Sequence, residues 1–140
     1  MTGAIENLVR LHRWTLDEKR RLLSDLERLA QRLSNDITLL DEEIASEQEV
    51  ASRSLEGAVA YPAFVAVAKR RRDKLVESLR AVEAEGEEAR MAVQTAFQEL
   101  KKYELAQAGA LKRAKDKAAR AEQLVEDELG LELHRRRGQR

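Results

Sequence analysis

The sequence predicts an all-α fold, a long antiparallel two-helix coiled-coil hairpin whose second helix is longer than the first. The composition combines 37% charged residues with 4% aromatic residues and a single proline. Such a mixture, rich in Ala, Glu, Lys, Arg and Leu, is typical of long helices. Apolar residues recur at steps of three and four along most of the chain, which is the spacing of a helix-pairing seam. This pattern breaks clearly once, between Ser52 and Tyr61, where small residues precede the proline.

The longest helical pattern runs from about residue 62 to residue 134. It contains only two glycines before Gly130, and no proline follows Pro62. At 1.5 Å of rise per residue, such a helix would be on the order of 100 Å long. Steps of four and three place one residue of each turn against a partner helix. The residues predicted to form this seam are Phe64, Ala68, Arg71, Leu75, Leu79, Val82, Gly86, Ala89, Val93, Ala96, Leu100 and Tyr103.

A first helix is predicted from about residue 4 to residue 55. Ser34, Asn35 and Asp36 all favour helix starts, but the apolar stripe continues through them, so we predict no break there. Both helices contain two consecutive steps of four, at Leu29–Leu33–Ile37 and at Arg71–Leu75–Leu79, and such spacing locally unwinds a supercoil. We therefore expect these segments to face each other. The predicted stripe of the first helix consists of Leu8, Leu11, Thr15, Leu22, Leu26, Leu29, Leu33, Ile37, Leu40 and Ile44.

The turn is predicted at about residues 56–61. Pro62 would open the second helix, because its missing N–H has no partner in a first turn. Residues 1–140 would form one coiled-coil hairpin with a frayed basic tail at 135–140. With a turn near residue 58, Trp14, Phe97 and Tyr103 would form an aromatic layer at the base of the hairpin. The longer second helix would extend past the first, and its apolar stripe would need a partner to cover it.

The composition argues against several functional classes. The charges of 26 basic and 26 acidic residues cancel, so the chain has no net positive charge that would attract nucleic acid. The chain lacks cysteine, and His12 and His134 alone do not make a metal site. No glycine-rich phosphate loop occurs, and a pair of helices offers no pocket that would shift carboxylate pKa values. We therefore expect no enzyme activity, cofactor or metal. No stretch has signal-peptide or membrane-span character, which favours a soluble cytoplasmic protein.

The densest charge run inside a helix is the segment 69–74, with the sequence Lys-Arg-Arg-Arg-Asp-Lys. It has two interpretations. Its long side-chain stems could cover the seam as an ordinary helix surface. Alternatively, it could be a docking patch near the hairpin tip, together with Tyr61, Phe64, Val65 and Val67. The position of Arg71 on the predicted seam slightly favours docking.

The order of these features resembles one known family. The chain begins with the segment 5–11, continues with the charged residues 17–20, and restarts at Tyr61-Pro62-Ala63-Phe64. A long Ala/Glu/Arg helix then carries the segment 96–101, Ala-Phe-Gln-Glu-Leu-Lys, and ends in a basic tail. With a length near 140 and two unequal arms, this order resembles the FliJ family of the flagellar type III protein-export apparatus.

The resemblance implies a concrete function. Members of the family are similar in shape to the central stalk of rotary ATPases. The end that carries both termini would enter the hexameric export ATPase, FliI, and the chain would couple it to the export-gate membrane protein, FlhA. The chain would lie in the cytoplasm, at the inner-membrane base of the flagellum. The family also implies binding of export chaperones, for which no residue can be assigned.

Site residues follow from the same resemblance. The gate contact would lie early in the second helix, at Phe64, Ala68 and Arg71. The uncovered stripe of the second helix would meet the ATPase ring, through Leu111, Ala118, Ala121, Leu124 and Val125.

Two alternatives remain open. The chain could be a self-associating structural or chaperone-like coiled coil whose extension pairs with its own copy. It could also be the equivalent stalk of another secretion system or of a rotary ATPase, since the same physical properties would serve there.

Overall fold

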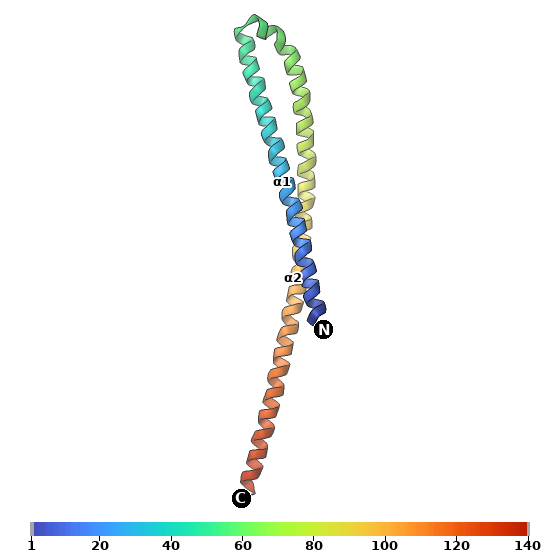
Figure 1. Ribbon diagram of the computed structural model, residues 1–140, viewed down its shortest axis with the longest axis vertical. Helices are drawn as coiled ribbons and strands as arrows, with labels where there is room; N and C mark the ends of the chain where they lie inside the picture. The colour runs from blue at the N-terminus through green and yellow to red at the C-terminus, as the bar shows by residue number, and fades with distance from the viewer. Residues whose placement is uncertain (1, 140) are drawn as a thin grey trace. The chain divides into compact units, whose positions relative to one another are not determined.

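Two helices make up the computed structural model, which describes residues 2–139 (Figure 1). Helix α1 spans Thr2–Arg53 and helix α2 spans Leu55–Gly138, with 52 and 84 residues. Ser54 alone separates them, and no strand occurs in the described residues. The predicted helical hairpin with a longer second helix is confirmed.

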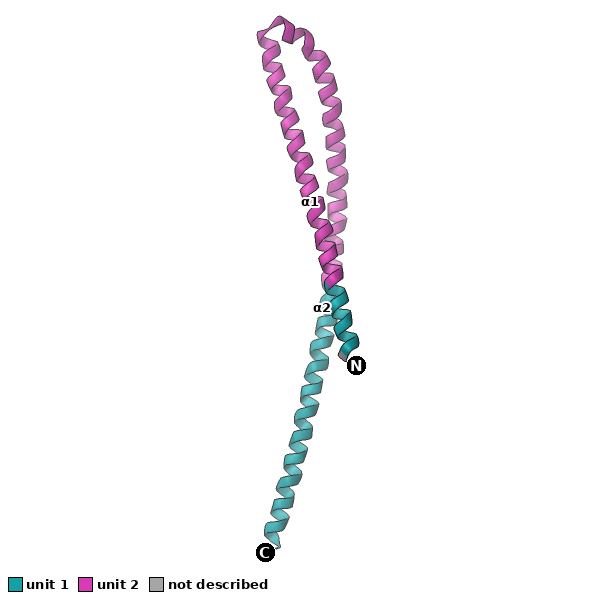
Figure 2. Cartoon of the chain, in the orientation of Figure 1, with its two compact units in different colours: residues 1–13, 98–140 teal, residues 14–97 magenta. Residues whose placement is uncertain are grey.

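The chain divides into two compact units (Figure 2). Unit 2 comprises residues 14–97, and in it the two helices run antiparallel from the connection at Ser54. Unit 1 comprises residues 1–13 and 98–140. Within unit 1 the start of α1 packs beside the first turns of the α2 portion, and α2 then continues without a neighbouring element.

The hairpin reverses at Ser54, which caps the start of α2. Its Oγ accepts a hydrogen bond from the Gly57 backbone N–H at 2.9 Å, the bond expected of an N-cap side chain. Its own N–H donates to the Val50 carbonyl at 3.2 Å, and its carbonyl accepts from the Ala58 N–H at 3.0 Å. One residue therefore ends α1 and starts α2 while its backbone groups stay bonded.

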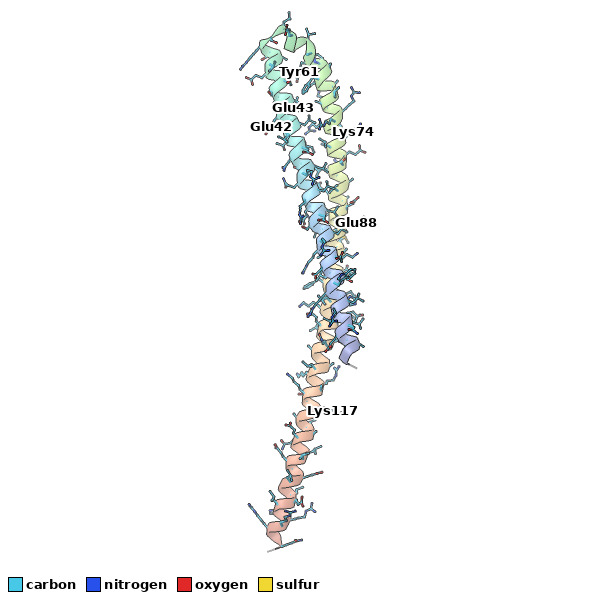
Figure 3. The ribbon with its side chains drawn as sticks, in the orientation of Figure 1. Glu42, Glu43, Tyr61, Lys74, Glu88 and Lys117 are labelled. Carbon is cyan, nitrogen blue, oxygen red and sulfur yellow. The ribbon has the colours of Figure 1, made fainter. Side chains whose placement is uncertain are left out.

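The predicted non-helical tip at residues 56–61 is wrong. These residues are the first turns of α2, and α1 ends at Arg53 rather than near residue 55. Pro62 lies inside α2 instead of opening it. Proline inside a helix removes one backbone hydrogen bond and crowds the preceding turn, which bends a helix. The ribbon of α2 curves over beside Tyr61, so Ser54 and the proline share the reversal (Figure 3).

The predicted frayed tail also differs from the structure. Helix α2 continues past residue 134 to Gly138, and Arg140 lies outside the described residues. Glu132 pairs with Arg136 one turn later at 3.1 Å, an (i, i+4) contact that supports the last turns of the helix.

The seam of α2 follows the predicted stripe, with one exception. Among its members, Ala68, Gly86, Ala89, Ala96 and Leu100 are buried. The exception is at the charge run, where Arg71 is exposed and Arg72 occupies the half-buried seam position. From Ala68 onward the steps alternate regularly between four and three, and the half-buried Val65, rather than Phe64, continues the alternation toward the turn, so the predicted unwinding is not needed.

The seam of α1 is displaced by one residue over the first half of the helix. Val9 and Leu16 are each 3% exposed, whereas Leu22, on the predicted stripe, is 50% exposed. Leu8, Leu11 and Leu29 are exposed as well. The actual seam alternates steps of three and four with a gap only at Lys19, and this keeps one face toward the partner. Its buried and half-buried members are Ile5, Val9, His12, Leu16, Leu23, Leu26, Ala30, Leu33, Ile37, Leu40 and Ile44.

The predicted aromatic layer is also wrong. Trp14 and Phe97 are exposed, and the Tyr103 ring instead stacks on His12, with centroids 4.4 Å apart and planes at 16°. The cause is the same displacement: His12, not Trp14, lies on the seam of α1.

No helix within residues 2–139 is long and apolar enough to span a membrane.

The cap at the turn gives a first prediction. We expect Ser54→Ala to lower the free energy of unfolding by about 1 kcal/mol, because the Gly57 N–H loses its acceptor. Ser52→Ala is the matched control, since that hydroxyl only bonds the Glu49 carbonyl inside α1. Urea unfolding followed by circular dichroism measures both. Equal effects of the two substitutions would contradict the assignment of Ser54 as the cap.

The displaced seam gives a second prediction. Leu16→Ala should destabilise the hairpin by about 2 kcal/mol, because it removes buried atoms from the seam. Leu22→Ala makes the same chemical change on a half-exposed side chain, so its loss of stability should be a small fraction of the loss caused by Leu16→Ala. Thermal unfolding of both variants tests the register of α1, and a larger loss at Leu22 would restore the stripe predicted from the sequence.

Candidate partner-binding surfaces

Near the turn, Phe64, Val67 and Arg71 lie on one face of α2, which we call the tip surface. Steps of three and four place them along one side of the helix. Phe64 is half-buried, Val67 is 61% exposed and Arg71 is exposed. Ala68, the remaining predicted gate residue, is only 4% exposed and belongs to the seam with α1. The structure therefore brings Phe64 and Arg71 together and replaces Ala68 by Val67 on the accessible face.

An ion pair between the two helices lies beside the tip surface. The Arg72 guanidinium donates from Nε to Asp41 Oδ1 at 2.6 Å and from Nη2 to Oδ2 at 3.3 Å. The hydrogen bond and the charge of Asp41 raise the pKa of Arg72 above its ordinary value, so Arg72 stays cationic. This two-pronged contact holds α1 and α2 together just below the tip.

The charge run at residues 69–74 supports both interpretations, the helix surface and the docking patch. Some of its side chains contact the chain itself, and others are exposed. Arg72 bridges to α1, and Arg70 donates from Nε to the Ala66 carbonyl of its own helix at 3.3 Å. Lys69, Arg71 and Lys74 are exposed. Lys74 lies on α2 and Glu42 and Glu43 lie on α1, all in this region of unit 2 (Figure 3). Arg71 lines a shallow groove with Asp36, Leu39, Leu40, Glu43 and Leu75.

The second surface is the overhang, which we define as residues 111–138 of α2. Every residue described in it is exposed. The five residues predicted to meet the ATPase ring all lie here, and helical spacing puts them within one side of the helix. Leu124 is 64% exposed, although leucine is a residue that usually packs inside. Ala121 and Val125 line a shallow hollow together with Glu122 and Glu126.

Leu111 marks the point where the seam ends. It borders a small groove shared with Ile5, Glu6, Gln107, Ala110 and Ala114, so the first turn of α1 still reaches it. Beyond this groove the apolar stripe of α2 continues with no element of unit 1 to cover it. The overhang is therefore a continuation of the seam that lacks its partner.

Polar contacts close the seam before the overhang starts. Arg13 Nε lies 3.8 Å from Glu104 Oε1, and Lys101 Nζ lies 3.5 Å from Glu104 Oε2. The stacked His12 and Tyr103 rings lie in the same turn. Among residues 2–139 no group of three or more His, Cys, Asp or Glu side chains could hold a metal ion.

Sequence reasoning missed one set of accessible apolar side chains. In unit 1, Leu8 and Leu11 of α1 are exposed, although they were predicted to face α2. The regular alternation through Ile5, Val9 and His12 is the signal that would have excluded them from the seam. These two side chains form an apolar surface on α1, in the same unit that contains the overhang.

Unit 2 contains an open groove of about 740 Å³ between the helices. Small side chains produce it, because Ala30, Ser34 and Gly86 leave space that Leu or Phe would fill. Arg72, whose pKa is raised, is not among its lining residues. An open groove of this kind does not exclude water, and we assign it no chemistry.

The family model described as "Flagellar FliJ protein" matches residues 1–139, nearly the whole chain. The chain belongs to the FliJ family. This membership confirms the resemblance noted in the sequence and makes the chain a flagellar export protein that associates with the export apparatus. Comparison with curated proteins found no match, and comparison with solved structures found none.

Proposed function

We propose that this FliJ-family chain is a non-enzymatic coupling stalk of flagellar type III export. In this proposal the overhang enters the ring of the hexameric FliI-like export ATPase, and the tip surface binds the FlhA-like gate protein. The chain acts in the cytoplasm, at the inner-membrane base of the flagellum. Export chaperones are further partners, with no residue assigned to them.

The observation that carries this proposal is the uncovered seam of the overhang. The same apolar stripe that packs on α1 up to Ala110 continues through Ala121 and Val125 with nothing on it. A continuous exposed apolar stripe on a helix marks a site of protein interaction. Leu8 and Leu11 add apolar surface in the same unit, so a ring would meet both helices of unit 1.

The tip surface supports the second half of the proposal. A half-buried aromatic ring beside an exposed arginine is a common composition for the centre of a binding site. Phe64 and Arg71 supply these groups, and Val67 adds an apolar contact between them. Ala68 contributes indirectly, because its small side chain lets α1 pack closely behind the surface.

The overhang gives the third prediction. Ala121→Asp should abolish most of the stimulation of the export ATPase, because a charge in the centre of the stripe must be desolvated on binding. Ala119→Asp is the matched control: it makes the same change two residues away, on the opposite side of the helix. ATP hydrolysis by the purified ATPase, with and without each variant, is the measurement. Equal stimulation by both variants would exclude the overhang as the ring contact.

The tip surface gives the fourth prediction. Phe64→Ala should weaken binding to the cytoplasmic part of the gate protein about tenfold or more, as expected for a central aromatic contact. Arg71→Ala should weaken it in the same direction. Arg70→Ala is the control, since Arg70 donates to its own helix and lies off the tip surface. Isothermal titration calorimetry measures all three, after circular dichroism has shown intact helices. A gate affinity unchanged in Phe64→Ala would place the contact elsewhere.

A further inference from the structure

The charges of the overhang are separated along the helix into two adjacent blocks of opposite sign. Residues 112–120 contain five basic side chains and one acidic one, Asp116. Residues 122–132 contain five acidic side chains and no basic one. The first stretch, which we call the basic stretch, therefore carries a net charge of +4, and the second, the acidic stretch, carries −5.

At several places in the paired part of the helices, opposite charges pair within one turn. Glu18 pairs with Arg21, Asp25 with Arg28 and Glu87 with Arg90, each three residues apart on one helix. In the described part of the overhang there is one ion pair, between Arg136 and Glu132. The side chains of the basic stretch have no carboxylate within 4 Å. The overhang thus presents two blocks of opposite charge, in which its own helix pairs Glu132 with Arg136 and donates a hydrogen bond from Gln123 Nε2 to Asp127 Oδ1 at 3.1 Å.

The apolar stripe is asymmetric in the same way. On the basic stretch it consists of small residues, Ala114 and Ala118, and on the acidic stretch it consists of larger ones, Val125 and Leu129. Facing positions in a helix interface pack best when a large side chain meets a small one. The basic stretch and the acidic stretch are therefore complementary to each other, both in charge and in the volume of their stripe side chains.

We propose that the overhang is a self-complementary interface that pairs antiparallel with the overhang of a second copy of this chain. A two-fold axis near Ala121 would set each basic stretch against the partner's acidic stretch and each alanine pair against the larger residues. A parallel arrangement would place basic on basic and acidic on acidic, which costs free energy. The pairing is isologous, so it closes as a dimer and does not propagate.

The charges that border the stripe are placed to act across this interface. At 100° per residue, Arg113, Lys117 and Arg120 lie along one border of the stripe. Glu128 lies along the same border, about two to four turns further on, and Asp127 lies beyond this border, about 120° from Ala121 around the helix. In an antiparallel pair of helices, side chains of one border meet side chains of the same border on the partner helix. The basic and acidic groups of this border would therefore meet between the two copies.

The pairing does not depend on the proposed stalk function, because it requires only the chain itself. It does concern the same stripe: a paired overhang has its apolar side chains covered and is not available to a ring. Self-association would then regulate how much of the chain can engage the ATPase.

A charge-swap experiment on the full-length protein tests the pairing, and it is the fifth prediction. Sedimentation equilibrium from about 5 to about 500 μM, the range in which a short helix pairing is half-formed, should show a rise from the 15.9 kDa monomer to twice that mass. A variant with acidic residues in the basic stretch (Arg113→Glu, Lys117→Glu, Arg120→Glu) should stay monomeric. A variant with basic residues in the acidic stretch (Glu122→Lys, Asp127→Lys, Glu128→Lys) should also stay monomeric. An equimolar mixture of the two should recover the dimer.

Lys112→Glu is the control for net charge, because Lys112 lies on the side of α2 opposite the stripe, and it should leave the dimer intact. Circular dichroism of each variant shows whether the helices are retained. A wild-type chain that stays monomeric at all concentrations would overturn the proposal. So would a dimer that survives both charge-reversed variants. Neither result bears on ATPase stimulation, which is measured separately with the partner enzyme.

The relative orientation of the two paired overhangs can be measured by cysteine crosslinking. The sequence contains no cysteine, so each introduced cysteine is the single reactive thiol of its variant. Ala114→Cys and Leu129→Cys are each made in the full chain, one of them with a mass tag, and a short bismaleimide crosslinker is added. In the antiparallel pair, identical positions lie about 22 Å apart, so the two variants should crosslink only when mixed. Crosslinking of each variant with itself, and not in the mixture, would overturn the antiparallel arrangement.

Discussion

The structure depends on one constraint: a single face of each helix must remain turned toward the other over many turns. A straight α-helix has 3.6 residues per turn, so only an alternation of three and four residues keeps a narrow seam in place. Both helices satisfy it once Val65, Arg72 and Ala30 are included among the seam residues, with one gap at the exposed Lys19. The seam contains small side chains at Ala68, Ala89 and Ala96, so stability is distributed over many thin layers. Within residues 2–139 no central cluster of large buried side chains could compensate for a slip in register.

The fold class could be predicted from composition and spacing, because a long run without helix breakers leaves few alternatives. The register of α1 could not be predicted in the same way. Two apolar stripes run one residue apart there, since Leu8 and Val9, and likewise Leu22 and Leu23, are adjacent. Hydrophobicity alone does not choose between them. The choice is made by continuity with Leu26 and Leu33, which only the stripe through Val9 and Leu16 reaches without an irregular step.

The turn illustrates a different limit of sequence reasoning. Proline is a strong signal for a helix start, and it drew the predicted boundary to Pro62. The structure starts α2 seven residues earlier, where Ser54 provides a cap through its hydroxyl group. Gly57 fits against this cap: a Cβ there would lie 3.0 Å from the Val50 carbonyl oxygen. The cap is a local contact between residues three apart, and serine is a favoured N-cap residue, so the sequence carried this signal and the proline outweighed it. Of the candidate residues, Phe64 is half-buried and those of the overhang are exposed, whereas Ala68 is buried on the seam, where the predicted stripe already placed it.

The isolation of the overhang has a consequence for its dynamics. A helix without tertiary contacts is held only by its own backbone hydrogen bonds and by helix propensity, and such helices are marginal in water. Gly130 weakens this segment further, by about 1 kcal/mol relative to alanine. The amide protons beyond Ala110 should therefore exchange with solvent much faster than those of unit 2. Whatever molecule covers the stripe also stabilises the helix that carries it, so binding and ordering of the last thirty or so residues become one event.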